Sequence, residues 1–244
     1  MVVFDMQRLL TGGFPKKWLK NNNYLNILVK YGFCGFSGYA DSKFDNSNNK
    51  CYFAFIFNNK KLEENSMQSN SQLVQFYLGQ GPDNRGRMID EILAWKDEQI
   101  ENVHDYIQWL FPLKETSAFN SSAPVLSEAD IATFRNNTKV NQKLLLSLAK
   151  LIDFYGFMAT WESGTYQIVK SKDFQQKSRN WLTRNNHNFL RITRILKSLV
   201  LLGSEKHSRI LLVALEEVYK DNSKIIGQET LNYWKDALNV NTSA

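Results

Sequence analysis

The chain has 244 residues, of which 43% are hydrophobic and 22% are charged, and its formal net charge is +6. This length and composition suit one globular domain, or one domain with an appendage. No stretch approaches the roughly 20 apolar residues of a membrane-spanning helix, and residues 1–10 lack the apolar centre of a signal peptide. The sequence therefore argues against a transmembrane receptor, and we expect a soluble, cytoplasmic protein.

The cysteines and histidines argue against thiol and metal chemistry. Both cysteines, Cys34 and Cys51, precede residue 67. The histidines lie far apart, and none has a second His or Cys three or four residues away: His104, His187 and His207. Because zinc sites draw on closely spaced ligands of these types, we expect no metal and no cofactor.

Residues 1–66 differ in composition from the rest of the chain. Ten Asn, eight Lys, eight Phe and four Tyr make up 30 of the 66 residues, in no sustained period. One interpretation is an N-terminal extension with a strand at residues 51–57. The other, which we favour, is translation of A- and T-rich upstream sequence before a native start at Met67. We therefore expect residues 1–66 to be irregular or poorly ordered, and the working domain to span residues 67–244.

The first part of this domain has the apolar spacing of short helices. Residues 79–86 are glycine-rich but lack the Gly-Lys-Ser/Thr ending of a phosphate loop, so they predict a turn. A short helix follows at residues 87–95. Asp97 can cap the next helix, which must end near Pro112 because proline lacks an N–H.

Two helices with clear end signals come next. Ser127 and Asp130 approximate a capping box, which predicts a helix to about residue 136. Thr138 can cap a longer helix, and Gly156 can close it.

The remaining pattern is a small hairpin followed by helices. Residues 161–169 predict a loop or a small β-hairpin, and helix resumes at about residue 173. A helix at residues 187–202 stops at Gly203. Ser204 then caps a helix with an apolar set, and a last helix covers residues 228–238. That apolar set is Ile210, Val213, Ala214 and Val218. The fold class predicted is all-α: one compact multi-helix domain with at most one small β-hairpin.

Charge is distributed unevenly along the domain. Residues 67–126 hold four basic and eight acidic side chains, net −4, whereas residues 171–210 hold nine basic and two acidic side chains, net +7. A basic segment of this kind can bind nucleic acid by neutralising phosphates. The alternative, which we favour, is that the acidic and basic helices lie close together and neutralise each other.

The first polar motif is residues 104–112. On a continuous helix, His104 and Gln108 share one face, and Asp105 and Trp109 share the neighbouring face. A His beside an Asp can act as a general base while the amide and the indole position a substrate. The alternative, which we favour, is that these side chains pack and make structural hydrogen bonds.

The second polar motif is residues 187–199. Arg191, Arg194 and Lys197 recur every three residues and predict a basic ridge that could hold a carboxylate or phosphate. His187 and Asn188 lie at the helix N-terminus, where free backbone N–H groups favour anions. The alternative is a ridge that is solvated or paired with acids such as Glu91, Glu98 and Glu101.

These two motifs, in this order, resemble the conserved region of the opioid growth factor receptors, over about residues 74–203. The absence of a repetitive tail makes the chain look like a compact, bacterial-type member. The resemblance implies a helical module that in animal members binds a short opioid peptide, and it allows peripheral membrane association. It implies a shared surface, for which we expect a ligand-binding role: His104, Asp105, Gln108, Trp109, His187, Asn188, Arg191 and Arg194.

The predicted function is a non-enzymatic binding or regulatory module. Its ligand would be a small anion or a peptide held by Arg191 and Arg194, and a protein partner is also compatible with the pattern. One alternative is nucleic-acid association through residues 171–210. Another is an enzyme that uses His104 and Asp105 on an anionic substrate.

Overall fold

The computed structural model describes residues 70–117, 120–162 and 165–239. The predictions for residues 1–66, including the strand at 51–57, and the proposed start at Met67 lie outside the described residues. The chain divides into two compact units. Residues 65–159 and 167–244 form one unit, which carries the helices described below. Residues 160–166, the outer part of a hairpin, fall outside this unit.

The described chain is mainly helical, as predicted. It begins with the short helices α4 (Gln72–Tyr77), α5 (Ile89–Leu93), α6 (Asp97–Asn102) and α7 (Ile107–Leu110), and continues with α8 (Glu128–Asn136) and α9 (Thr138–Phe154). Strands β1 (Phe157–Glu162) and β2 (Thr165–Lys170) form a two-stranded antiparallel hairpin. Then follow α10 (Phe174–Lys177), a 3-10 turn (Ser178–Asn180), α11 (Asn188–Leu201), α12 (Glu205–Ile226) and α13 (Gln228–Asp236). The all-α prediction with one small hairpin is confirmed for these residues.

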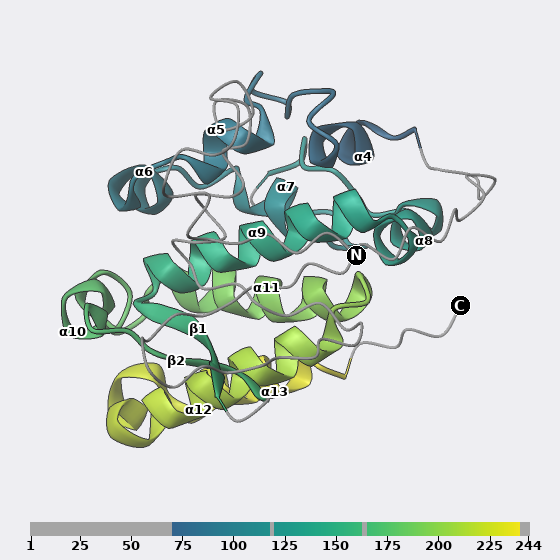
Figure 1. Cartoon of the computed structure of the whole chain (residues 1–244). Helices are drawn as coiled ribbons and strands as arrows, with labels where there is room; N and C mark the ends of the chain where they lie inside the picture. Colours follow the sequence, from purple (N-terminus) through teal and green to yellow (C-terminus); the bar gives the residue numbers. More distant parts are fainter. Residues whose placement is uncertain (1–69, 118–119, 163–164, 240–244) are drawn as a thin grey trace, which may run out of the picture. The chain divides into compact units, whose positions relative to one another are not determined.

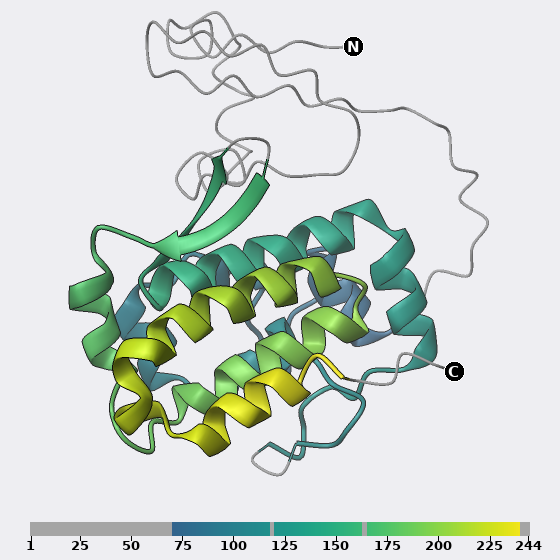
Figure 2. The same cartoon turned by 90° about the horizontal axis from the view of Figure 1, so that it is seen from below.

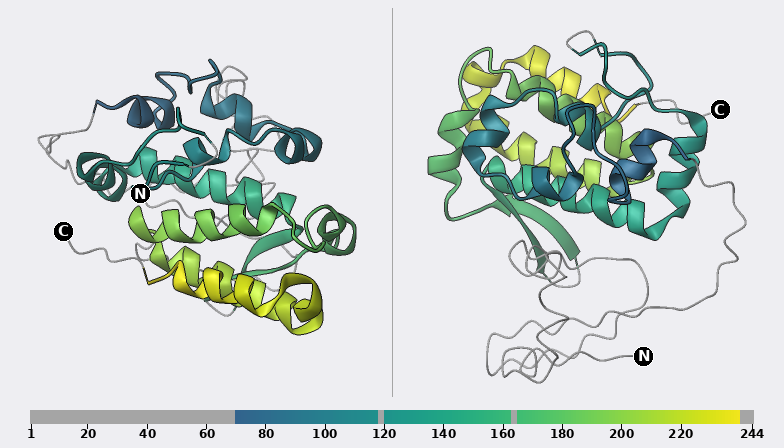
Figure 3. Two further views of the ribbon diagram at one scale, coloured as in Figure 1. Left: turned by 180° about the vertical axis from the view of Figure 1, so that it is seen from behind. Right: turned by 90° about the horizontal axis from the view of Figure 1, so that it is seen from above.

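The helical unit is layered. Figure 1 shows α4 to α7 on one side of α9 and α11 to α13 on the other, and the reverse view in Figure 3 shows the same order. Helix α9 packs against α4, α5 and α8, while α11 packs against α12 and α13. Figure 2 shows α11, α12 and α13 running as neighbouring rods. None of the helices in the described ranges is both long enough and apolar enough to cross a bilayer.

Helix α9 forms the centre of this unit. Asn137 caps it, because its Oδ1 accepts hydrogen bonds from the N–H groups of Lys139 (3.0 Å) and Val140 (3.2 Å). The apolar stripe predicted for this helix is buried. Lys143 and Lys150 also lie in the interior, where they donate hydrogen bonds to Asp90 Oδ1 and to the carbonyl of Trp95. These bonds attach α9 to the segment that carries α5.

Gly156 ends α9 as predicted. Its φ of +86° lies in the left-handed region, where glycine is favoured. A Cβ at this position would lie 2.9 Å from the Cα of Phe174. The turn therefore requires glycine for two reasons, backbone conformation and close approach of the chain after β2.

The helix predicted from Asp97 to Pro112 is wrong. The chain leaves helical geometry at Val103 (φ −91°, ψ 132°), and the next helix begins at Ile107, so α6 and α7 are separate. Lys96, rather than Asp97, is the residue that precedes α6. His104 and Gln108 therefore do not share a helical face, and neither do Asp105 and Trp109. The physical cause is a side chain from α11, described below.

Four smaller predictions need correction. The hairpin begins at Phe157, four residues before the predicted loop. Asn137 rather than Thr138 caps α9. Ser204 precedes α12 but makes no side-chain capping bond, and Val213 is 58% exposed rather than part of the apolar face. Leu211 and Leu215 lie on the buried face instead, so that the buried face of α12 is rotated about the helix axis relative to the predicted one.

Candidate functional site

The two motifs meet along α11. The segment from Ile100 to Pro112 lies against this helix and turns a series of backbone carbonyls toward it. Side chains at one-turn intervals on α11 donate to these carbonyls. We call this contact region the motif junction, formed by residues 100–112 and the face of α11 that carries Arg191, Arg194 and Ser198.

Arg191 is the centre of the motif junction and is only 5% exposed. Its Nη1 donates to the carbonyl of Ile100 (3.0 Å), and its Nη2 donates to those of Glu101 (3.3 Å) and Val103 (2.9 Å). Its guanidinium carbon lies 5.6 Å from the centre of the Tyr106 ring. The last carbonyls of a helix lack intrahelical partners, so Arg191 supplies from outside the bonds that end α6.

Arg194 and Ser198 continue this pattern. Arg194 Nη1 donates to the carbonyl of Phe111 (3.2 Å), and Ser198 Oγ donates to that of Pro112 (2.9 Å). Burial lowers the pKa of Arg194, while the charge of Glu115 raises it in opposition. Lys197 pairs with Glu115 (2.5 Å) at the exposed edge. The side chains of the predicted basic ridge therefore mostly make contacts within the protein.

The other first-motif residues face the turn at residues 79–87. Asp105 accepts from Arg85 Nε (3.0 Å) and Arg87 Nη1 (2.9 Å). Burial opposes ionisation of Asp105, but its hydrogen bonds to Arg87 and Arg85 and their charges hold its pKa below the usual value. Trp109 Nε1 donates to Asn84 Oδ1 (3.1 Å). Asp105 and Trp109 thus fix the turn that we predicted.

Gln108 is buried, with 6% of its surface exposed. Its Oε1 has no hydrogen-bond partner among the residues that the structure describes. The first motif therefore divides: Asp105 and Trp109 face the turn, whereas His104 faces α11.

The histidines of the two motifs come together at the motif junction. The rings of His104 and His187 are 4.9 Å apart, edge to face. His104 Nδ1 lies 3.2 Å from Arg191 Nη2. Since a guanidinium only donates, a hydrogen bond here requires Nδ1 as the acceptor. The structure thus brings together His104, His187, Asn188 and Arg191 from the predicted set.

Glu101 connects this histidine pair to α11. Its Oε2 accepts from Asn188 Nδ2 (3.0 Å), and its Oε1 lies 3.5 Å from His187 Nε2. Asn188 Oδ1 in turn accepts from Arg191 Nη1 (3.2 Å). Glu101, Asn188 and Arg191 are therefore joined by consecutive side-chain hydrogen bonds.

Acidic and basic segments pair as charge neutralisation predicts. Lys177 Nζ lies 3.5 Å from Asp97 Oδ2 and 3.1 Å from Asp153 Oδ1. Lys197 pairs with Glu115, as noted above. These pairs reduce the positive field of residues 171–210.

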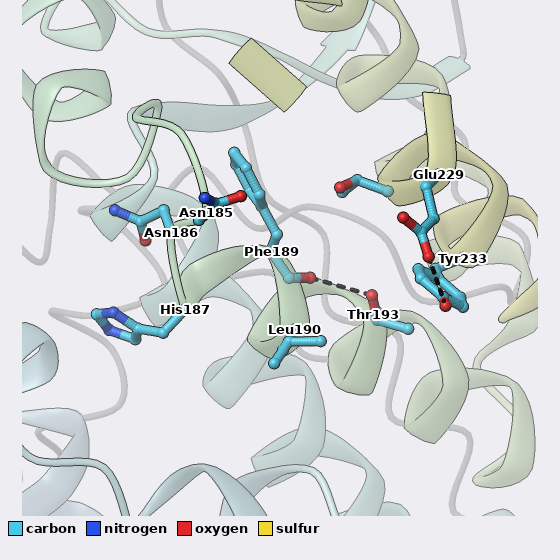
Figure 4. A pocket seen from close by; sticks show the side chains of 9 residues that line it. Asn185, Asn186, His187, Phe189, Leu190, Thr193, Glu229 and Tyr233 are labelled. Carbon is cyan, nitrogen blue, oxygen red and sulfur yellow. Dashed lines mark hydrogen bonds between the residues drawn. The ribbon is translucent and has the colours of Figure 1, made fainter. Parts of the chain in front are cut away.

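A cleft of about 370 Å³ opens beside the motif junction, between the start of α11 and α13. Figure 4 shows Phe189, Leu190 and Thr193 of α11 on one side and Glu229 and Tyr233 of α13 on the other. The loop before α11 closes one end of the cleft, through Asn185, Asn186 and His187. This volume lies within the range of pockets that take small ligands.

The rims of the cleft are apolar and exposed. Leu190 is 59% exposed and Tyr233 is 53% exposed, whereas Phe189 beneath them is buried. Tyr233 Oη donates to Glu229 Oε1 (3.0 Å), which raises the pKa of this exposed phenol. The opening of the cleft thus carries two large, partly exposed side chains, one from each helix.

Among the eight predicted site residues, only His187 lines this cleft. The sequence did contain an indication for Leu190, because this large apolar residue lies on the polar side of α11, directly before a charged residue. Nothing in the sequence indicated that α13 would lie opposite. The ligand-binding role of the eight predicted residues stays a prediction, and seven of them do not line this cleft.

Comparison with known proteins identifies relatives of this chain. Residues 64–243 match the family described as Opioid growth factor receptor (OGFr) conserved region. The opioid growth factor receptor of Rattus norvegicus is 39% identical over 125 residues, which is 50% of this chain and 21% of that protein. Opioid growth factor receptor-like protein 1 of Mus musculus is 33% identical over 154 residues, 61% of this chain and 32% of that protein.

The chain spans about a fifth to a third of the length of these relatives. They are vertebrate proteins, so the expected bacterial-type membership has no support in these matches. No solved structure matches. The family match extends over more than half of the chain and includes both motifs. This chain therefore belongs to the opioid growth factor receptor conserved-region family.

Proposed function

We propose that this chain is a non-enzymatic binding module that holds a short peptide in the cleft between α11 and α13. The observation that carries this proposal is the pair of exposed apolar side chains, Leu190 and Tyr233, on opposite rims of one cleft. An extended peptide can place an apolar side chain between them. Its backbone can then bond to polar lining groups such as Thr193 and Asn185.

The cleft has a firm base. Trp234 is fully buried and its Nε1 donates to the carbonyl of Phe189 (3.1 Å). The rings of these two residues pack edge to face, 5.9 Å apart. Because the base is fixed before a ligand arrives, binding loses little entropy in ordering the protein. A fixed base with exposed rims is typical of a recognition surface.

The relatives support binding rather than catalysis. Two of them, from rat and human, are named opioid growth factor receptor, and we infer a peptide ligand for this chain from that name. The contacts of His104 and Asp105 point the same way. His104 Nδ1 accepts from Arg191, while Asp105 pairs with Arg85 and Arg87. A general base oriented by this aspartate would need the two side chains to meet.

In this proposal the predicted site residues have two roles. His187 closes one end of the cleft and lies next to the ligand. Asn188, Arg191 and Arg194 hold α11 in place through the motif junction, so they position the cleft without touching the peptide.

The test uses substitutions that alter the rims and leave the base intact. Leu190→Ser with Tyr233→Ser removes both apolar rims. Val213→Ser is the matched control, because Val213 is 58% exposed on α12 and does not line the cleft. The probes are fluorescently labelled opioid growth factor and a phage-displayed library of seven-residue peptides, and Kd is measured by fluorescence anisotropy.

We expect the double variant to bind at least about tenfold more weakly, since two exposed apolar contacts contribute roughly 1.4 kcal/mol or more together. Val213→Ser should bind as the unchanged protein does. The proposal fails if neither probe binds. It also fails if the double variant binds the selected peptides as tightly as the control.

A further inference from the structure

Among the residues that the structure describes, the cleft between α11 and α13 is lined by one acidic side chain and by no lysine or arginine. The acid is Glu229, near the start of α13. Burial and the charge of Arg191 lower the pKa of the lining residue His187, so its ring adds no positive charge at neutral pH. The cleft is therefore negative, although α11, which forms one of its walls, is a basic helix.

Glu229 differs from the acids of the preceding helix because it has no basic partner. Each acidic side chain of α12 lies within 4.0 Å of a lysine or arginine: Glu205, Glu216, Glu217 and Asp221. Within the described ranges, the exposed Glu229 forms no such pair. Its charge is therefore available to a ligand that enters the cleft.

The hydroxyl groups beside Glu229 and across the cleft have already used their hydrogens. Figure 4 shows both bonds: Tyr233 Oη donates to Glu229 Oε1 (3.0 Å), and Thr193 Oγ1 donates to the carbonyl of Phe189 (3.0 Å). A hydroxyl has one hydrogen and two lone pairs, and an ionised carboxylate only accepts. These oxygens of both walls can thus only accept from a ligand. An ammonium group, which has three donors and no acceptor, complements them.

We propose that the cleft takes the amino-terminal residue of a peptide, with its ammonium group on Glu229 and a large apolar side chain between Leu190 and Tyr233. This inference rests on the proposed function for the peptide itself. It gives the ligand a charge opposite to that of the small anion expected from the sequence. That anion was assigned to Arg191 and Arg194, neither of which lines the cleft.

The short spacing of the two partners favours an amino terminus over a lysine side chain. Glu229 and Tyr233 are one helical turn apart, and their hydrogen bond places the carboxylate at the tip of the phenol ring. On an amino-terminal residue, the ammonium group and the side chain leave the same carbon, so one residue can meet both partners. A lysine ammonium lies at the end of a flexible four-carbon stem, and ordering this stem costs more conformational entropy.

The first arm of the test compares two forms of opioid growth factor and of each library-selected peptide. Both forms carry the fluorophore at the carboxyl end. One has a free amino terminus, and the other is N-acetylated, which removes the ammonium charge. We expect the acetylated form to bind the unchanged chain at least about threefold more weakly at pH 7.0, as anisotropy measures. Equal affinities would overturn the inference and leave the proposed function standing.

The second arm removes the carboxylate from the cleft. Glu229→Gln keeps an oxygen that can accept from Tyr233, and in this variant the two peptide forms should bind within about 1.5-fold of each other. Asp236→Asn is the matched control, because it removes an equal charge from an exposed residue of α13 that does not line the cleft. It should keep the threefold difference. The inference is wrong if Glu229→Gln keeps this difference, or if both variants lose it equally.

The third arm uses pH to separate an amino terminus from a lysine. An α-amino group ordinarily titrates near pH 8 and a lysine near pH 10.4. The free form should therefore bind about twofold or more weakly at pH 9.0 than at pH 7.0, whereas the acetylated form should change little. Tyr233 stays protonated at pH 9.0, because its hydrogen bond to Glu229 raises its pKa.

The outcomes distinguish this inference from the proposed function. A free form that binds equally at both pH values, while still binding better than the acetylated form, would overturn the assignment to the amino terminus. If no peptide binds in either form, the proposed function fails and the inference fails with it.

Discussion

Replacing Arg191 with Ala should destabilise the fold severely. The guanidinium donates to three backbone carbonyls, to Asn188 Oδ1 and to His104 Nδ1, and it is 5% exposed. Each hydrogen bond from a charged donor contributes about 1.5–3 kcal/mol, and a buried group left without a partner costs about 1–3 kcal/mol. These contributions overlap. The removal of one member of a buried charged network typically costs about 3–5 kcal/mol, and we expect this range here.

Equilibrium urea unfolding, monitored by tryptophan fluorescence, measures this loss as a lower midpoint at constant slope. A loss of about 4 kcal/mol is a large part of the roughly 5–15 kcal/mol that stabilises a domain. Arg191→Lys should recover only part of it, because an ammonium cannot reach all three carbonyls at once.

Arg184→Ala is the matched control, since Arg184 is exposed in the same basic segment. Its stability should change by no more than about 0.5 kcal/mol. A loss below about 1 kcal/mol for Arg191→Ala would refute the structural role. If that small loss came with a large loss of anion or peptide affinity, the predicted ligand-binding role of Arg191 would be correct instead.

Three further changes probe other parts of the fold. Gly156→Ala should lower stability by about 2 kcal/mol or more, because its Cβ would meet the Phe174 Cα at 2.9 Å. Gly79→Ala, at a φ of +70° with no atom within 4 Å of the added Cβ, should cost only about 1 kcal/mol in the same urea assay. Burial lowers the pKa of His207 to about 4, so the folded state binds fewer protons than the unfolded state. About 3 kcal/mol of stability should therefore be lost as the pH falls from 6.5 to 4. In His207→Gln the urea midpoint should change less with pH over this range. Ser127→Ala should cost about 1 kcal/mol by thermal unfolding, because its Oγ accepts from the N–H of Asp130 (3.1 Å), and an unchanged Tm would contradict this cap.

Much of the helical pattern could be predicted because local signals determine it. Helix α11 was predicted within one residue at each end, since its apolar stripe is regular and Gly203 adopts a φ of +82° after it. The capping box of Ser127 and Asp130 is local in the same sense. Such features depend only on residues within one or two helical turns, so they can be predicted from the sequence of one chain.

The break at Val103 could not be predicted in this way. Residues 97–112 have acceptable helical spacing, and the chain departs from it because Arg191 binds the carbonyls that the break exposes. The same holds for the candidate site. Arg191 and Arg194 look like ligand-binding groups in the sequence, yet the backbone of the first motif occupies their donors. The cleft depends on where α13 packs, which is a tertiary property.

The contacts of Arg191 also have a consequence for the order of folding. They join residues 91, 90 and 88 positions apart in the chain. A loop of this length must close before α6 acquires its C-terminal bonds, and loop closure of that kind is slow compared with helix formation. During synthesis the segment around Val103 leaves the ribosome well before α11. Its irregular shape can therefore become fixed only when α11 has been made and has docked.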